Sequence, residues 1–459
     1  MYAIITIAIV AILVLLFGAF EKKRILLPII AVGLPAAFVA GLYGWNQSIH
    51  YFNEMYIGDN FSIAFNAVLI FSTLLIFLYA PVYYKPIKRP LEDIYALILF
   101  ALAGGLMMTS FGNLVMLFLG IETLSISLYI LAGSKKSDPA SNEAAMKYFL
   151  TGSFASGFLL FGIALLYGAT GSFNLAEIHH YVLLNQTNLP DIFVIGFLLL
   201  AVGMTFKVGA APFHFWAPDV YEGSPTLITS FMATVGKVAA FAAFYRLMNS
   251  CFGEVEQIWK TTFTIFAIAT IVIGNFTALY QDNVKRMFAY SGIAHAGYML
   301  IALVALKQQA SGVLLLYSIS YSIATITAFA VLIMVRENTG SFSIKSFNGL
   351  AKSNPVAAYA MTISLLSLAG IPPLIGFSAK FNLFIKAFEG GNIALVMIAV
   401  VGSMVSIYYY FRPVVAMYFS TADEHQPVAS GNQYKTQILI ATILLIALSF
   451  APALIVNLL

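Results

Sequence analysis

Charged residues are scarce in this sequence. Only 9% of its 459 residues are Asp, Glu, Lys or Arg, whereas 61% are hydrophobic, and the mean hydropathy is +0.91. Globular domains in water carry about 25% charged residues, so this composition excludes a soluble globular chain. A helical membrane crossing takes about 20 apolar residues, and the chain has room for a dozen or more. The composition therefore predicts an all-α polytopic membrane protein.

Cysteine is almost absent, since Cys251 is the only one. A single cysteine excludes internal disulfides, and it excludes cysteine zinc sites and iron–sulfur clusters held by this chain alone. The dinucleotide signature GxGxxG, the phosphate-loop signature GxxxxGK[ST] and the zinc signature HExxH do not occur either. We therefore expect no metal site and no cofactor on this chain, so that any redox or nucleotide chemistry takes place on partner chains.

Long apolar runs are plentiful instead. The runs between charged or turn-rich breaks predict fourteen membrane helices. The first has no basic residue before it and a basic cluster directly after it, which is the reverse of a signal peptide, so it is expected to be retained. The predicted ranges are 3–20, 25–45, 60–82, 92–111, 113–133, 144–168, 191–222, 225–248, 260–280, 286–306, 311–335, 355–389, 391–417 and 436–456.

Lysine and arginine are distributed unevenly over the loops. Loops after even-numbered helices hold only Arg246, Lys260, Lys307 and Lys386. Because basic loops stay in the cytoplasm, the asymmetry predicts cytoplasmic odd-numbered loops and both termini on the periplasmic side. The basic residues of the odd-numbered loops are Lys22, Lys23, Arg24, Lys85, Lys88, Arg89, Lys135, Lys136, Lys147, Lys285, Arg286, Arg336, Lys345, Lys352, Arg412 and Lys435.

The seventh and twelfth predicted helices are too long for one simple crossing, and both are interrupted by proline. The breaks lie at Pro212 and at Pro372 and Pro373, and each helix carries Gly-x-x-x-Lys, at 203–207 and at 376–380. Two units of five helices, the fourth to eighth and the ninth to thirteenth, would start on opposite sides of the membrane because five is odd. Inverted repeats with a discontinuous helix in each half are typical of transporters and ion paths.

These repeats divide the chain into four predicted parts. Helices one to three occupy 1–90, the first repeat 91–250, the inverted second repeat 251–420 and the last helix 421–459. The halves differ in one respect. Proline follows the lysine in the first broken helix and precedes it in the second, so the two halves need not behave alike.

Four ionisable side chains lie deep inside predicted spans: Glu122, Lys207, Lys237 and Lys380. A charge at the bilayer centre costs about 2.5–3.5 kcal/mol on insertion scales, so we expect these groups to face the interior and to act on protons or ions. Since burial disfavours a charged lysine, a nearby carboxylate that moves can make a lysine take up or release a proton. The alternative is a structural ion pair, such as Glu122 with one lysine, that only holds helices together.

Four further residues are secondary candidates or have two interpretations. His295, about nine residues into the tenth helix, can relay protons or simply pack through hydrogen bonds. His214 belongs to the first break. Glu143 and Lys147 are spaced i,i+4 at the start of the sixth helix, where they can equally form an ordinary helix-end pair. The tyrosine run at 408–410 is interpreted as interface and packing.

Three stretches are specific enough to indicate a family: FKVGAAPFHFWAPDVYEGSP, FMATVGKVAAFAAF and YSGIAHAGYML. They resemble the antiporter-like membrane subunits of respiratory complex I, and DVYEGSPTLITSFMATVGKVAAF is most similar to the N-type subunit, the counterpart of mitochondrial ND-two. The resemblance runs from about the third predicted helix to the thirteenth. It implies that Glu122, Lys207, Lys237 and Lys380 match the family's glutamate–lysine pair, central lysine and exit-side lysine, and that His295 matches a histidine of its central polar axis.

The resemblance implies a proton-translocating subunit of an NADH:quinone oxidoreductase in the bacterial inner membrane. NADH, FMN, iron–sulfur clusters and quinone are then expected on partner subunits, and the expected neighbours are other antiporter-like and small membrane subunits. An Mrp-type cation/proton antiporter subunit is the main alternative, although the N-type sequence motif favours complex I. A membrane subunit of an energy-converting hydrogenase or a photosynthetic NDH complex, and an inert scaffold with buried charges, are further alternatives.

Overall fold

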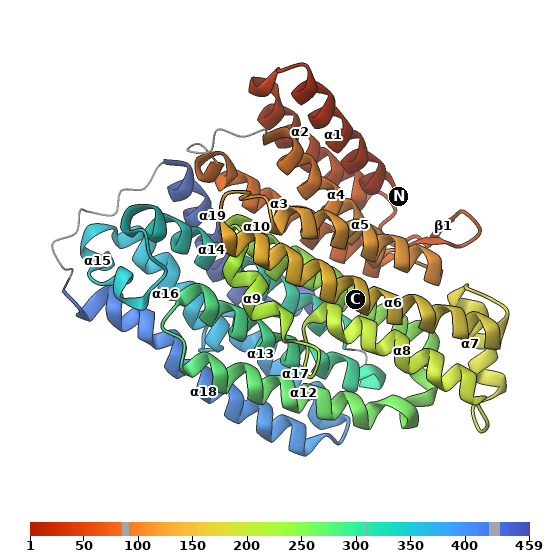
Figure 1. Cartoon of the computed structure of the whole chain (residues 1–459). Coiled ribbons are helices and arrows are strands. Elements are labelled where there is room, and N and C mark those ends of the chain that lie inside the picture. The colour runs from red at the N-terminus through yellow and green to blue at the C-terminus, as the bar shows by residue number, and fades with distance from the viewer. Residues whose placement is uncertain (85–90, 309, 422–431) are drawn as a thin grey trace.

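The computed structural model describes residues 1–84, 91–308, 310–421 and 432–459, which form a bundle of long helices (Figure 1). Eleven helical stretches in these residues are long and apolar enough to cross a membrane. One of them, 226–279, contains both the eighth and the ninth predicted helices, and two shorter apolar helices match the twelfth and fourteenth. The predicted all-α polytopic fold is confirmed.

The first six helices follow the predicted ranges closely. They are α1 (Tyr2–Ala19), α2 (Leu26–Leu42), α3 (Asn60–Tyr84), α4 (Leu91–Thr109), α5 (Leu114–Ala132) and α6 (Pro139–Thr170). The predicted eighth helix consists of α10 (Thr226–Phe231) and α11 (Lys237–Leu247), which are joined by the π-helical residues Met232–Gly236. The later long helices are α12 (Glu256–Leu279), α13 (Val284–Val304), α14 (Ser311–Thr339), α18 (Ile393–Phe419) and α19 (Asn432–Ser449), with short helices α15 (Leu350–Ser353) and α20 (Pro452–Val456).

The seventh and twelfth predicted helices are each split in two. The seventh consists of α8 (Asp191–Val208) and α9 (Trp216–Gly223), and the twelfth of α16 (Pro355–Ala369) and α17 (Ile375–Glu389). Gly209 and Gly370 end the first halves with φ of 71° and 81°. Because residues with a Cβ rarely adopt this left-handed conformation, glycine suits the helix end at both places.

A hairpin and two short helices, one of them α15, were not predicted. An antiparallel hairpin of β1 (Ile49–Tyr51) and β2 (Tyr56–Gly58) lies in the loop before α3. A short helix, α7 (Leu175–Leu184), follows α6; it buries Leu175, Ile178 and Val182 along one face, and Asn174 caps its first turn. The spacing of its apolar residues is typical of an amphipathic helix. The segment is too short to cross a membrane, so a search for membrane helices does not find it.

Contacts between loops show which ends of the helices lie together. A β-bridge joins Asn113, before α5, to Asn174, after α6, and another joins Asn283, before α13, to Ser343, after α14. Loops after even-numbered predicted helices therefore meet at one end, and loops after odd-numbered ones meet at the other. Three residues used for the orientation lie outside the described residues: Lys85, Lys88 and Arg89. The predicted division into four parts stays a prediction, and its first boundary, at residue 90, also lies outside them.

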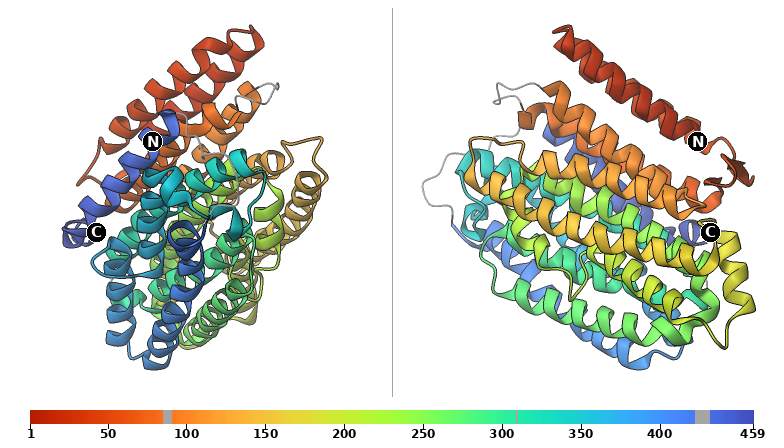
Figure 2. Two further views of the ribbon diagram at one scale, coloured as in Figure 1. Left: turned by 90° about the vertical axis from the view of Figure 1, so that its left-hand side faces the viewer. Right: turned by 45° about the vertical axis from the view of Figure 1, so that its right-hand side comes forward.

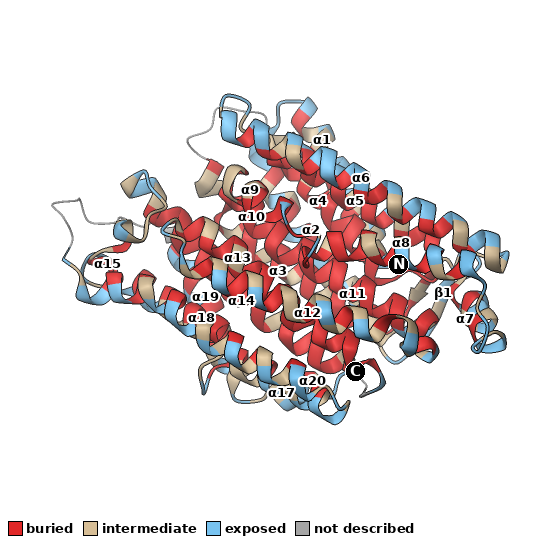
Figure 3. Cartoon of the chain, turned by 60° about the horizontal axis from the view of Figure 1, so that its bottom comes forward, coloured by how far each residue is buried: buried red, intermediate tan, exposed pale blue. Residues whose placement is uncertain are grey.

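The core lies around α13 and α14. In the apolar stretch of each of these helices, 94% of the residues are buried (Figure 3). Helices at the periphery, such as α6 and α18, expose most of one face. The pair α1 and α2 stands at one side of the bundle, as Figure 2 shows, and packs mainly on α4 and α3. Since α11 and α13 carry Lys237 and His295, two of the predicted site residues lie in the most buried part of the protein.

Candidate functional site

Glu122 and Lys207 come together at a cluster of hydroxyl groups between α5, α6 and α8. Ser156 of α6 donates to Glu122 Oε1 at 2.5 Å, and Lys207 Nζ lies 3.3 Å from the same serine oxygen. Lys207 also donates to Ser125 Oγ at 3.0 Å and to Tyr129 OH at 3.4 Å. The serine therefore bridges the carboxylate and the ammonium group.

The broken helix explains how a lysine is held here. Lys207 lies in the last turn of α8, which ends at Gly209, and a cation is favoured by the helix dipole at that end. Polar groups of the break find partners inside the protein, since Ala211 N donates to Thr270 Oγ1 of α12 at 2.9 Å and Trp216 Nε1 donates to Phe206 O at 3.2 Å. Backbone that is not helical can exist within a membrane only when it is satisfied in this way.

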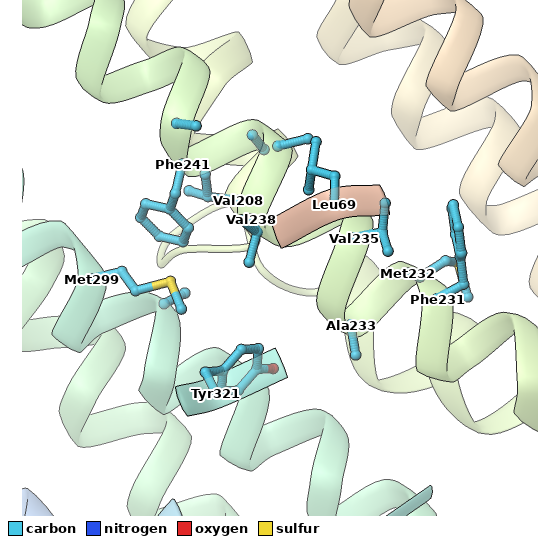
Figure 4. Close-up of a cluster of buried hydrophobic side chains, with 14 of the residues drawn as sticks. Leu69, Val208, Phe231, Met232, Ala233, Val235, Val238, Phe241, Met299 and Tyr321 are labelled. Atoms are coloured by element: carbon cyan, nitrogen blue, oxygen red, sulfur yellow. The ribbon is translucent and has the colours of Figure 1, made fainter. Parts of the chain in front are cut away.

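Lys237 lies deeper, at the start of α11 directly after the π-helical segment. Its side chain is buried, donates to the carbonyl oxygen of Gly292 on α13 and points over the ring of Tyr321 at 5.8 Å. Apolar side chains, among them Val235 and Val238, surround this part of the bundle (Figure 4). A cavity of about 20 Å³ is lined by both Lys207 and Lys237, which is room for one water molecule.

His295 of α13 lies between two tyrosines that come from α14 and α18. Its Nδ1 is 2.6 Å from Tyr317 OH and its Nε2 is 3.1 Å from Tyr410 OH, and Tyr410 also hydrogen-bonds with Ser291. The ring of Tyr321 is 4.9 Å from the imidazole. Tyr321 therefore contacts both Lys237 and His295.

Lys380 occupies the second break. Its Nζ donates to the carbonyl of Ala369 at 3.0 Å and to Ser403 Oγ at 3.1 Å, and it lies 4.7 Å from the centre of the Tyr298 ring. Ala369 is the last residue of α16, so the ammonium reaches the C-terminal end of the first half-helix, which is also where Lys207 lies in α8. The opposite order of proline and lysine in the two halves thus gives the same pairing of a lysine with a helix end.

Hydroxyl and amide side chains complete a polar line that the sequence analysis missed. Tyr298 OH is 3.2 Å from Asn275 Nδ2, and Tyr409 donates to Asn275 Oδ1 at 3.1 Å. The interpretation of the 408–410 run as interface and packing fits the exposed Tyr408 and the buried Tyr409 and Tyr410, but it left out the hydrogen bonds that the two buried tyrosines make. Adjacent tyrosines within an apolar span indicate that some hydroxyl groups need partners inside the membrane. Only the fold shows which rings point toward the interior.

The secondary candidates have different surroundings. His214 is buried in the first break, and among the described residues its Nδ1 has no hydrogen-bond partner. Lys147 contacts Glu143 at 2.7 Å, as the helix-end pair predicts, but it also contacts Asp219 of α9 at 2.6 Å. Arg286 of α13 continues this network to Asp219 and Glu222, at 3.3 Å and 2.6 Å. It joins α6, α9 and α13 at the end of the bundle where the odd-numbered loops lie.

Among the described residues, no direct ion pair holds the four deep charges. In the part of the chain that the structure describes, none of the ion pairs within 4.0 Å includes Glu122, Lys207, Lys237 or Lys380. The ion-pair alternative therefore lacks the contact it requires. Among the same residues, no three His, Cys, Asp or Glu side chains gather in a way that could hold a metal ion, and the absence of cofactors from this chain stays a prediction.

Ser156 gives a first test of this geometry. We expect Ser156→Ala to weaken the influence of Glu122 on Lys207, because the hydroxyl that contacts both groups is lost. Proton translocation should fall, but by less than the about 10²-fold expected for a lost proton-transfer group, because Ser156 acts on Lys207 and does not itself carry the proton. The measurement is proton uptake by the reconstituted complex, with Ser153→Ala on the same helix as control. Equal proton uptake in the two variants would contradict the bridging role.

Comparison with known proteins identifies relatives of this chain. Residues 112–406 match the family described as "NADH:quinone oxidoreductase/Mrp antiporter, TM". The chain is 45% identical over 423 residues to NADH-quinone oxidoreductase subunit N of Cytophaga hutchinsonii, covering 91% of this chain and 90% of that protein. It also superimposes on a chain of respiratory complex I from Thermus thermophilus with bound aureothin, with a TM-score of 0.85, 31% identity and coverage of 99% and 98%.

A chain of the Mrp complex from Dietzia sp. DQ12-45-1b superimposes with a TM-score of 0.90, covering 99% of this chain and 95% of that chain. Its identity is only 20%, so this likeness concerns the fold alone. The sequence relationship, in contrast, extends over nearly the full length of subunit N and confirms the resemblance found in the motifs. The chain belongs to the NADH-quinone oxidoreductase subunit N family.

Proposed function

We propose that this chain moves protons across the membrane along the line from Glu122 through Lys207, Lys237 and His295 to Lys380, as part of an NADH:quinone oxidoreductase. One observation carries the proposal. Three lysines and a histidine lie within an apolar bundle, and each is held by hydroxyls, rings or backbone carbonyls instead of carboxylates. Since an ammonium in such surroundings is costly, these groups are suited to gaining and losing protons.

The contacts suggest a role for each group. Glu122, acting through Ser156, sets how strongly Lys207 holds its proton. Lys207 passes the proton to Lys237 through the small cavity that both line. His295 receives it on the far side of Tyr321, and its two tyrosine partners can exchange protons with either ring nitrogen. Lys380, beside Ser403 and the end of α16, delivers the proton toward the opposite side.

We infer that these residues take no part in redox chemistry. NADH, FMN, iron–sulfur clusters and quinone are then bound by partner subunits. The chain is a multi-pass membrane protein of a multi-subunit complex, and we propose that neighbouring antiporter-like and small membrane subunits pack against it. The lysine-rich end, where the odd-numbered loops meet, is then cytoplasmic, and both termini are periplasmic in a bacterial inner membrane.

An Mrp-type antiporter is the alternative that shares this fold. The full-length relationship to subunit N favours complex I, because the Mrp chain is similar in fold only. A strain that lacks this chain distinguishes the two. Loss of NADH-driven quinone reduction is expected for complex I, whereas sodium-sensitive growth with intact respiration would favour the antiporter. An energy-converting hydrogenase or a photosynthetic NDH complex would be identified by the subunits that co-purify with the tagged chain.

The direct test is Lys207→Met in the assembled complex. Methionine has a similar length and removes only the proton-binding amine, so the fold should be kept. We expect the number of protons moved per electron to fall, because the group that loads the proton is gone. The measurement is proton uptake and NADH oxidation in the same proteoliposomes. A full proton-to-electron ratio in this variant would exclude the proposed role of Lys207.

A further inference from the structure

An apolar groove lies apart from the polar line, between α2, α3, α14 and α19. Its volume is about 440 Å³, and its walls include Phe38, Phe71, Ile319 and Leu448. None of the ionisable residues assigned above lines it. Apolar walls suit the hydrocarbon chain of a lipid.

The depth of the groove matches one leaflet of a bilayer. Its lining extends along α3 from Ala64 to Ser72 and along α14 from Leu315 to Ile323. Since α3 begins at Asn60 and α14 at Ser311, the groove ends about 18 Å from the helix starts at 1.5 Å per residue. Half of a hydrocarbon core is about 15 Å. The groove therefore reaches approximately to the middle of the membrane and stops.

A polar pocket continues the groove at its outer end. The pocket has a volume of about 580 Å³, and Leu458 lines both the pocket and the groove. Trp45 lies at the groove wall after the end of α2, and tryptophan is enriched at the membrane–water boundary. The polar residues that line the pocket are Asp59, Asn60, Arg246, Asn249, Ser250 and Ser311.

Arg246 supplies a positive charge to the lining of this pocket. Its side chain is only 5% exposed, and Nη2 donates to Asp59 Oδ1 at 2.5 Å. Its Nε, however, is buried and has no hydrogen-bond partner among the described residues. Buried donors without partners are costly and uncommon in native proteins, but this nitrogen is closed off from the pocket, so a ligand there meets the outer guanidinium nitrogens. A phosphate group matches the guanidinium geometry.

We propose that the groove and the pocket together bind one phospholipid with a primary ammonium headgroup, as in phosphatidylethanolamine. One acyl chain fills the groove, the phosphate accepts from Arg246, and the ammonium lies beside Asp59. Charge complementarity selects this headgroup. Because Arg246 and Asp59 present one positive and one negative charge, a zwitterionic lipid satisfies both, whereas a purely anionic lipid leaves Asp59 beside negative charge. In the proposed orientation the lipid belongs to the periplasmic leaflet.

The experiment uses the complete complex, purified in detergent and depleted of lipid. Phosphatidylethanolamine with a photoactivatable diazirine on one acyl chain is added and crosslinked, and the labelled peptides are identified by mass spectrometry. Unlabelled phosphatidylethanolamine or phosphatidylglycerol serves as the competitor. We expect adducts on groove segments of α3 and α14, and stronger competition by phosphatidylethanolamine.

Three variants sharpen the test. Ala67→Phe places a ring in the groove and should lower adduct yield about tenfold, the effect of overpacking an apolar site. Ala36→Phe makes the same change on the exposed face of α2 and should leave the yield unchanged. Asp59→Asn keeps an oxygen that can accept from Ser62 N but removes the charge, so competition by the two lipids should become equal.

The outcomes decide between occupants. Adducts spread equally over the groove and the outer face of α2, or an unchanged yield in Ala67→Phe, would overturn the site. Absence of adducts from the groove segments of α3 and α14 in the assembled complex would show that lipid does not fill the groove. If Ala67→Phe fails to assemble, the Asp59→Asn comparison decides alone: a preference for phosphatidylethanolamine that persists in that variant contradicts the proposed headgroup contact.

Discussion

Replacing Lys237 with methionine is expected to stop proton translocation through this chain. Lys237 is buried and lines the cavity that it shares with Lys207, so no other amine can take its place between Lys207 and His295. Loss of a proton-transfer group lowers a rate by about 10²–10⁴-fold. Proton uptake should therefore fall by about a hundredfold or more, measured in proteoliposomes as acidification driven by NADH oxidation.

The fold should tolerate this change. Lys237 donates to the carbonyl of Gly292, which lies within α13 and keeps its own helical hydrogen bond. Methionine also removes a charge whose burial is unfavourable, so the complex should assemble in normal amounts. The control is Lys260→Met, because Lys260 pairs with Glu256 at 3.1 Å on α12 and lies outside the polar line. If Lys237→Met pumps as well as this control, Lys237 does not carry protons.

Replacing Gly376 with alanine is expected to disrupt the second broken helix. A Cβ at this position would lie 1.8 Å from the carbonyl oxygen of Ser367 and 2.6 Å from its carbon. Both atoms are backbone, so α16 and α17 must move apart instead of adjusting a side chain. We expect the free energy of unfolding to fall by about 3 kcal/mol or more, at or beyond the upper range for overpacking. We also expect Lys380 to be displaced from Ala369. The measurements are the thermal unfolding midpoint of the complex and its proton uptake.

The chain offers a matched control for this substitution. Gly157 lies on α6, and a Cβ there would meet no atom within 4 Å. Alanine is favoured over glycine inside a helix by about 1 kcal/mol, so Gly157→Ala should be neutral or slightly stabilising. If the Gly376→Ala and Gly157→Ala complexes unfold at the same temperature, the close approach of α16 and α17 at Gly376 does not contribute to stability, and the prediction is wrong.

Several features of the protein could be predicted from sequence because they depend on composition along the chain. Long apolar runs must cross the bilayer as helices, and this gave the order of the membrane helices. Proline in a long apolar span identified both breaks. A lysine or glutamate in such a span is costly, so Glu122, Lys207, Lys237 and Lys380 stood out without a structure. The short helix α7 was missed because its amphipathic pattern covers only ten residues.

Other features depend on which helices become neighbours. Ser156 separates Glu122 from Lys207, and Tyr410 reaches His295 from 115 residues away. Serine and tyrosine are cheap to place in a membrane span, so nothing in the sequence distinguishes those that contact a lysine from those that pack. The groove that holds the proposed lipid is likewise formed by four helices from opposite ends of the chain.

The two lysines of the broken helices illustrate the division most clearly. A lysine near each break could be predicted, because Gly-x-x-x-Lys accompanies the prolines in both long spans. The sequence also indicated, through the reversed order, that the two halves need not behave alike. The meeting of both lysines with the end of a first half-helix depends on the packing of helices, since α17 packs beside α16 and brings Lys380 Nζ to 3.0 Å from the carbonyl oxygen of Ala369. The physical reason is that spacing along a chain fixes the residues on one helix face, whereas packing between helices fixes which groups an ammonium can reach.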